Sequence, residues 1–238
     1  MATLSTKIIA TIGPASIKFP VFQELVDAGI DYIRINSKYG DDSQYNLILE
    51  NLKNAQPQNR IEVIFDIKEI SKLDYALKHN IKHIALSFTE QAKQIEEVRK
   101  IIPNAFVIAK IESEKGVQNF DEILKSSDGI MVARGDLSIS VSFEQVPPLQ
   151  KEFTYKTLRE EKFLITATEM LLSMTNNPEP TRAEVSDVAN AVFDHSSAVM
   201  LSEETAIGKY PVETVKMMKK IIEEAAESIN YLEKLKQF

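Results

Sequence analysis

The stretch AFVIAKIESEKGVQNFDEILKSSDGIMVARGDL, residues 105–137, contains two short apolar runs separated by an amphipathic segment. Residues 105–110 and 129–132 have the length and composition of strands that are covered on both faces, and residues 117–126 have the pattern of a helix. A strand, a helix and a second strand make a βαβ unit, which favours a parallel sheet.

The same alternation continues along the whole chain. The predicted strands are 7–12, 30–35, 61–67, 81–86, 105–110, 129–132, 163–167 and 198–201. The predicted helices are 19–28, 41–54, 71–79, 90–101, 117–126, 145–160, 181–194 and 212–232.

Eight such units predict an α/β fold, a single (β/α)8 TIM barrel. A doubly wound open sheet is the alternative that periodicity alone leaves open, although neither GxGxxG nor GxxxxGK[ST] occurs in the chain. We expect one barrel domain over residues 1–238, with a frayed tail at 228–238.

Composition narrows the class of protein. The 238 residues carry 28 Lys and Arg against 35 Asp and Glu, a formal net charge of −7, and no Cys. An acidic balance disfavours nucleic acid and anionic membranes as partners, and the lack of Cys excludes a disulfide scaffold or a thiolate nucleophile. We find no secretion signal and no apolar run near the roughly 18 residues of a membrane span, so we expect a cytoplasmic protein.

Polar residues lie at the carboxyl ends of six of the predicted strands, where barrel enzymes place their chemistry. They are Arg34 and Asn36, Asp66 and Lys68, Lys110 and Glu112, Arg134 and Asp136, Thr168 and Glu169, and Ser202, Glu203 and Glu204.

Lys110 and Glu112 lie two apart on an extended strand, so their side chains face the same way. Glu112 and Asp136 together are typical ligands of a divalent cation. An ammonium beside them, such as that of Lys110, would stabilise an oxyanion or an enolate. Arg34 suits a phosphate or carboxylate. A purely structural alternative remains open on residue types alone: Lys110 paired with Glu112 or Asp136, and Arg34 in a salt bridge.

Five long segments resemble the pyruvate kinase family in order and spacing. They are TKIIATIGPAS (6–16), RINSKYG (34–40), VIAKIESEKGVQNFDEILKSSDGIMVARGDLS (107–138), TATEMLLSMTNNPEPTRAEVSDVANAV (166–192) and AVMLSEETAIGKYPVETV (198–215). The resemblance covers about residues 6–227. It implies a barrel that binds phosphoenolpyruvate or pyruvate, a Mg²⁺-dependent phosphotransferase in which Mn²⁺ can replace Mg²⁺, and a place in glycolysis.

The resemblance also implies roles for single residues. Lys110 looks like the lysine that stabilises the enolate, Thr168 like the threonine near the methyl carbon of pyruvate, and Arg34 like the arginine on the phosphoryl group. Glu112 and Asp136 look like the metal ligands. The segment expected to bind the substrate, with its backbone cradling the carboxylate, comprises Ala133, Arg134, Gly135 and Asp136.

The family's K⁺ site is altered in this sequence. Asn36 and Asp66 match positions linked to that site, whereas Lys38 stands where the family has a serine. We therefore expect the Lys38 ammonium to take the place of K⁺.

Other departures affect the nucleotide half of the site. The family inserts a lid domain after the third strand, but here Lys68 is followed almost at once by the next helix. The chain stops after the eighth predicted helix, so we expect no regulatory domain. Ile207 replaces a lysine near the nucleotide phosphates, and Glu203 replaces a glycine. Phosphoryl transfer depends on positioned cations. These changes therefore weaken the part of the site that would bind the nucleotide, and they leave unchanged the residues expected to stabilise the enolate.

Three functions follow from these observations. The first is a pyruvate kinase-like enzyme that acts on phosphoenolpyruvate, pyruvate or a related 2-oxo acid. The alternatives are a nucleotide-independent lyase or decarboxylase on a 2-oxo acid, and a non-catalytic barrel that binds phosphoenolpyruvate. Residues 181–194 resemble a segment at subunit contacts, so we also expect a homo-oligomer.

Overall fold

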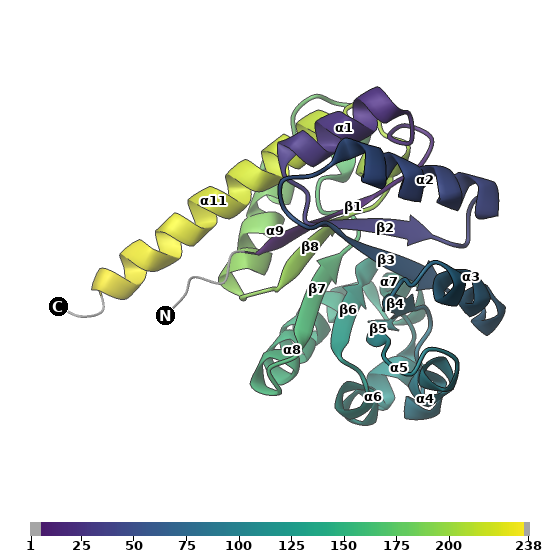
Figure 1. The fold of residues 1–238 in the computed structure, drawn as a ribbon. Helices are drawn as coiled ribbons and strands as arrows, with labels where there is room; N and C mark the ends of the chain where they lie inside the picture. Colours follow the sequence, from purple (N-terminus) through teal and green to yellow (C-terminus); the bar gives the residue numbers. More distant parts are fainter. Residues whose placement is uncertain (1–5, 236–238) are drawn as a thin grey trace.

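The computed structural model describes the backbone of residues 6–235 and the side chains of residues 6–229. Eight parallel strands form a closed barrel, in which each strand pairs with the next and β8 pairs with β1 (Figure 1). The strands are β1 (Lys7–Thr11), β2 (Tyr32–Asn36), β3 (Glu62–Ile67), β4 (His83–Leu86), β5 (Phe106–Ile111), β6 (Gly129–Ala133), β7 (Phe163–Ala167) and β8 (Ala198–Leu201). The predicted (β/α)8 fold is confirmed, and the open sheet is excluded.

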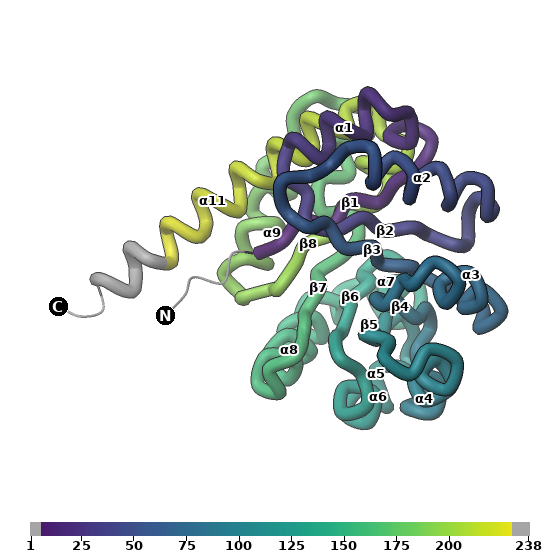
Figure 2. The backbone as a smooth tube through the Cα atoms, viewed as in Figure 1, coloured from purple at the N-terminus to yellow at the C-terminus, as the bar shows by residue number. Residues whose placement is uncertain are grey.

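The helices follow the strands in sequence. They are α1 (Phe19–Ala28), α2 (Asp42–Ala55), η1 (Ile70–Lys72), α3 (Leu73–Lys78), α4 (Ala92–Ile101), α5 (Glu114–Gln118), α6 (Phe120–Ser126), α7 (Arg134–Ser140), η2 (Phe143–Gln145), α8 (Val146–Arg159), η3 (Leu172–Thr175), α9 (Arg182–Phe193), α10 (Glu203–Ala206) and α11 (Pro211–Leu235). Helices α1 and α11, from the two ends of the chain, pack side by side and so complete the ring (Figure 2).

Local signals set the limits of these helices. Gly29 ends α1 with φ of 98°, a conformation that few other residues adopt. Thr181 and Glu184 form a capping box at the start of α9, each side chain accepting the other residue's backbone N–H. Helix α11 runs as far as Leu235 and so includes the first part of the tail expected to fray from residue 228, whereas residues 236–238 lie outside the described residues. No helix in the described part of the chain has the length and apolar character needed to cross a membrane.

The barrel interior changes character along the strands. Ile9, Ile64 and Ile108 are fully buried in its apolar middle. Side chains on a strand alternate between faces, so the next inward positions are two residues further on. Those positions on β3 and β5 are Asp66 and Lys110. The closed barrel therefore brings charged side chains together at the carboxyl ends of its strands, above an apolar floor.

The opposite end of the interior is closed by four aromatic rings, which we call the aromatic plug: Tyr32, His83, Phe106 and Phe163. Neighbouring ring centroids lie 5.1 to 6.0 Å apart. These distances are typical of packed aromatic pairs. The plug closes the end of the barrel at which the strands begin.

Candidate active site

Lys110 lies at the centre of the buried charges at the carboxyl ends of the strands. Its Nζ is 3.0 Å from Asp66 Oδ2 and 2.9 Å from Glu112 Oε1, and it donates to Ser87 Oγ at 2.8 Å. Only 6% of Lys110 is exposed. We call Arg34, Asp66, Ser87, Lys110 and Glu112 the Lys110 cluster. Two carboxylates and a hydroxyl thus hold one ammonium in a fixed position.

Arg34 supplies the second positive charge of the cluster. Its Nε donates to Asp66 Oδ2 at 2.8 Å and its Nη1 donates to Thr11 Oγ1 at 3.1 Å. Burial acts to raise the pKa of Asp66, but Lys110 and Arg34 outweigh burial and lower that pKa below its ordinary value. Asp66 is therefore ionised at neutral pH. The structural salt bridge that the residue types alone left open for Arg34 is therefore present, and its partner is Asp66.

Glu112 differs from Asp66 in the sign of its pKa shift. Its Oε2 accepts the Phe88 N–H at 2.7 Å, and its Oε1 faces Lys110. Burial nevertheless raises the pKa of Glu112 above its ordinary value, although Lys110 and the Phe88 N–H act in the opposite direction. The surroundings of Glu112 hold less positive charge than a buried carboxylate needs.

A divalent cation fits this shortage of positive charge. Asp136 lies in the first turn of α7, after the strand that pairs with β5. It is exposed, and its side chain makes no hydrogen bond or ion pair with a described residue. Among the described residues, no group of three or more His, Asp or Glu side chains is assembled to hold a metal. Mg²⁺ commonly takes one or two carboxylates and completes its shell with water and substrate oxygens. Glu112 and Asp136 are the residues that would hold it.

The N-terminus of α7 meets the end of β7. Helix α7 begins at Arg134, directly after Ala133, so a helical turn presents backbone N–H groups around Gly135. The Gly135 N–H donates to Thr168 Oγ1 at 2.8 Å. The structure thereby brings together the segment expected to bind a carboxylate and the threonine expected near the reacting carbon.

Some expected site residues are not brought to the cluster. Lys38 is exposed, and its Nζ lies 5.3 Å from the centroid of the Tyr39 ring. Its backbone N–H donates to Asn36 Oδ1 at 3.2 Å. The Asp66 carboxylate accepts from the side chains of Arg34, Ser87 and Lys110. The placement of Lys38 therefore gives no support to the idea that its ammonium replaces K⁺ beside Asp66.

Two polar residues at this site escaped the sequence reasoning: Ser87, a member of the cluster, and Thr11, which accepts a hydrogen bond from Arg34. Ser87 directly follows β4 and donates to Asp66 Oδ1 at 3.0 Å, and Thr11 ends β1. Both occupy the strand-end position that marked the other candidates. Applying that rule to every strand, rather than to charged residues first, would have found them.

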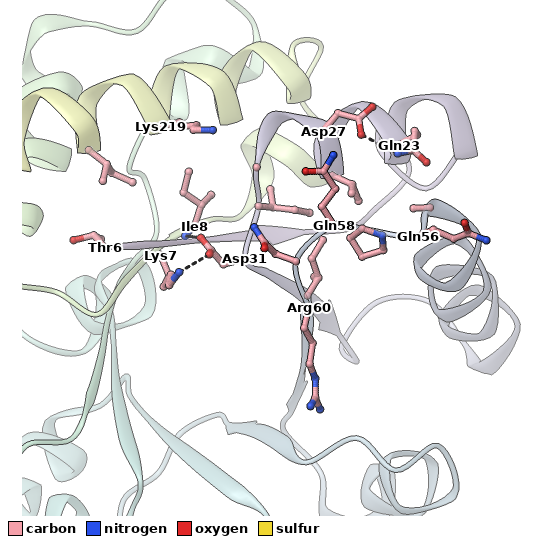
Figure 3. A pocket seen from close by; sticks show the side chains of 18 of the residues that line it. Thr6, Lys7, Ile8, Gln23, Asp27, Asp31, Gln56, Gln58, Arg60 and Lys219 are labelled. Carbon is pink, nitrogen blue, oxygen red and sulfur yellow. Dashed lines mark hydrogen bonds and ion pairs between the residues drawn. The ribbon is translucent and has the colours of Figure 1, made fainter. Parts of the chain in front are cut away.

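A cavity of about 730 Å³ lies at the opposite end of the barrel, around the start of β1 and the loop before β3 (Figure 3). Its lining includes Lys7 and Asp31, joined by an ion pair of 2.9 Å. That pair is half exposed at Lys7, so it is screened by water and carries no strong field. We assign the candidate site to the Lys110 cluster, because buried charges converge there at the catalytic end of this fold.

The fold and the cluster define a (β/α)8-barrel protein with a charged site at the carboxyl ends of its strands. The family model described as pyruvate kinase, barrel domain, matches residues 65–215. The chain therefore belongs to the pyruvate kinase family. The matched range contains Asp66, Lys110, Glu112, Asp136 and Thr168.

Curated relatives agree with this assignment. The chain is 52% identical to the pyruvate kinase of Chlamydia muridarum over 169 residues, which are 69% of this chain and 35% of that protein. It is 44% identical to the pyruvate kinase of Geobacillus stearothermophilus over 192 residues, 79% of this chain and 31% of that protein. For the Methanocaldococcus jannaschii pyruvate kinase the identity is 43% over 176 residues, 72% of this chain and 39% of that protein. The chain spans about a third of the length of these relatives.

Proposed function

We propose that this chain is a Mg²⁺-dependent enzyme that forms an enolate from pyruvate, phosphoenolpyruvate or a related 2-oxo acid. The observation that carries the proposal is the buried Lys110 ammonium, held within 3.0 Å of both Asp66 and Glu112. A fixed positive charge in a water-poor site stabilises an oxyanion more strongly than the same charge in water. Membership of the pyruvate kinase family supports the substrate class.

Each residue of the site has a proposed task. Lys110 faces the enolate oxygen as charge develops on it. Mg²⁺, when bound by Glu112 and Asp136, supplies Lewis-acid stabilisation. The N–H groups at the start of α7 orient the substrate carboxylate, and any carboxylate there lies beside Thr168 Oγ1, which is 2.8 Å from the Gly135 nitrogen. The task we propose for Thr168 is to handle the proton at the methyl carbon.

Transfer of a phosphoryl group to ADP is the finer proposal, and it has less support in this chain. Ile67 ends β3 and Ile70 begins η1, so no domain is inserted between them. Ile207 is 63% exposed, and Glu203 beside it is acidic. Nucleotide-independent chemistry on a 2-oxo acid, such as decarboxylation or retro-aldol cleavage, does not need positive side chains around a nucleotide phosphate. It is our second candidate.

The experiment is proton exchange at pyruvate. The protein is incubated with pyruvate and Mg²⁺ in D₂O, and the methyl protons are followed by NMR. We expect Mg²⁺-dependent exchange that falls about 10³-fold in Lys110→Met. Lys7→Met is the matched control, because Lys7 is paired with Asp31 at the other end of the barrel and should leave exchange unchanged.

Two further outcomes separate the candidates. Turnover of phosphoenolpyruvate with ADP, in a coupled assay, would place the kinase reaction first. Binding of phosphoenolpyruvate without any exchange at pyruvate would instead favour the non-catalytic barrel. Equal loss of exchange in Lys110→Met and Lys7→Met would contradict a catalytic task for Lys110.

We also propose that residues 181–194 contribute to self-association. Helix α7, which is tied to α9 by the Arg134–Asp187 ion pair, exposes Ile139 to 85%, and Phe143 after it is 78% exposed. Phe193 in α9 is also 43% exposed, and a contiguous apolar surface formed by such side chains would mark a contact with a partner. Light scattering after size-exclusion chromatography tests this, and a monomer at micromolar concentration would contradict it. A cytoplasmic location stays a prediction.

A further inference from the structure

The backbone at the end of β7 adopts a conformation that its residues disfavour. Thr168 has φ of 71° and Glu169 has φ of 55°. Positive φ is uncommon for any residue except glycine, and it is particularly unfavourable for a β-branched residue such as threonine. Something outside these two residues must hold them in place.

The side chain of Arg134 makes the contacts that can do this. Its Nε donates to the carbonyl oxygen of Ala167 at 3.1 Å, and its Nη2 donates to that of Thr168 at 2.6 Å. These two carbonyls belong to the peptide groups that precede and follow the Cα atom of Thr168. A planar guanidinium that binds both carbonyls fixes the peptide planes around Thr168.

The guanidinium is itself anchored from behind. Asp187 lies on α9. Its Oδ1 accepts a hydrogen bond from Arg134 Nη1 at 2.8 Å, and its Oδ2 lies 2.7 Å from Arg134 Nη2. Such a two-point pair sets the plane of an arginine as well as its position. Further along the loop, the Leu171 N–H donates at 3.1 Å to Oε1 of the fully buried Glu204. The strained pair is thus held on both sides.

We propose that the Arg134 side chain is a positioning residue, which holds Thr168 in its left-handed conformation and so keeps the Thr168 hydroxyl at the Gly135 N–H. Two hydrogen bonds fix the position of the hydroxyl, because it accepts from the Gly135 N–H and donates to the Ala167 carbonyl at 2.6 Å. The geometric part of the inference stands on these contacts, and its catalytic consequence rests on the proposed function.

The first test measures the geometry and needs no activity. Hydrogen exchange of the Gly135 amide is followed by NMR in the wild type, Arg134→Met and Thr168→Ala. We expect the amide to exchange at least about 10-fold faster in both variants, because each loses the bond between Gly135 and Thr168. Arg99→Met is the matched control, because Arg99 likewise joins a backbone carbonyl, that of Ser126, to an aspartate, Asp128, on other elements of the barrel. Unchanged protection of Gly135 in Arg134→Met would overturn the proposal.

The second test measures the chemistry in a double-mutant cycle. We expect Arg134→Met to lower the rate of pyruvate exchange at saturating substrate by about 10²-fold, with a smaller effect on KM. In the Thr168→Ala background the same substitution should cost less than about 3-fold, because the group it positions is already gone. Additive losses would show that Arg134 acts by another route.

Two features keep these tests decisive. If Arg134→Met does not fold, Asp187→Asn removes the anchor but leaves Arg134 in place, and it should speed Gly135 exchange to a smaller degree. If the wild type exchanges no pyruvate protons, the proposed function fails, while the Gly135 amide still decides whether Arg134 holds Thr168.

Discussion

The two ends of the barrel interior are built on the same strands and have opposite chemistry. On β2, Tyr32 belongs to the aromatic plug, and Arg34 two residues later belongs to the Lys110 cluster. On β5, Phe106 belongs to the plug and Lys110 to the cluster. Only a few residues along one strand therefore separate the packed rings of the aromatic plug from the paired charges of the Lys110 cluster.

This difference indicates a division of labour within one fold. Burial of aromatic rings contributes directly to stability, since apolar surface leaves water. Burial of Arg34, Asp66, Lys110 and Glu112 carries a desolvation penalty that their mutual attraction only partly offsets. The cluster makes sense as a site prepared for a charged ligand, and the plug as the part of the interior that keeps water away from the base of that site.

The largest effect on stability is expected from Asp66→Asn. The substitution leaves Arg34 and Lys110 without the carboxylate they share, at 2.8 and 3.0 Å. Breaking a buried charge pair at one partner costs about 3–5 kcal/mol; here Arg34 loses its carboxylate, and Lys110 keeps only Glu112, at 2.9 Å. Urea unfolding followed by circular dichroism measures the change. A loss below about 1 kcal/mol would show that water reaches the cluster and that the contrast between the two ends is weaker than we infer.

Phe106→Ala tests the other end and should have a smaller effect. Phe106 is half-buried and packs against both His83 and Phe163. Removing its ring should lower the free energy of unfolding by about 2 kcal/mol, below the range for fully buried phenylalanines. Pyruvate exchange by the folded variant should stay within about 2-fold of the wild type. A large loss of exchange with little loss of stability would contradict the division of labour.

Much of the fold could be predicted because strands buried on both faces are continuous apolar runs. The bounds of β7 and β8 were predicted as they occur, and the others differ by one or two residues. Helix α7 was not predicted as an element, because it buries a single side chain, Leu137, and so has no apolar period to detect. Helix α10 buries Glu204 and Thr205, which sequence patterns assign to a surface.

The candidate site could be predicted in part, for a related reason. Lys110 and Asp66 lie within strands, where the two-residue alternation fixes their direction once the barrel closes. Lys38 lies beyond the end of β2, where the loop sets the direction of each side chain, and it points to Tyr39 instead of Asp66. The positive φ of Thr168, and the contacts by which Arg134 fixes it, depend on the end of β7, the start of α7 and Asp187 of α9 meeting in space, which no local pattern encodes.

The smallest expected effect concerns how the aromatic plug responds to pH. Burial lowers the pKa of His83 below its ordinary value of 6.5, although Glu62, 3.9 Å from its Nδ1, acts to raise it and Arg60 acts to lower it. Below pH 6.5 the unfolded chain therefore binds a proton at this histidine more readily than the folded chain does. Stability that is present above that pH is lost as the pH falls toward the folded pKa.

Two variants test this reasoning in opposite directions. His83→Phe keeps a ring in the plug and removes the titrating group, so the free energy of unfolding should fall less between pH 7.5 and 5.5 than in the wild type. Glu62→Gln removes the carboxylate that supports the charged imidazole, so the same fall should become steeper. Urea unfolding at the two pH values gives both numbers, and each change should be a fraction of the effect of Phe106→Ala. If both variants shift the pH dependence in the same direction, His83 is not the group that couples the plug to pH.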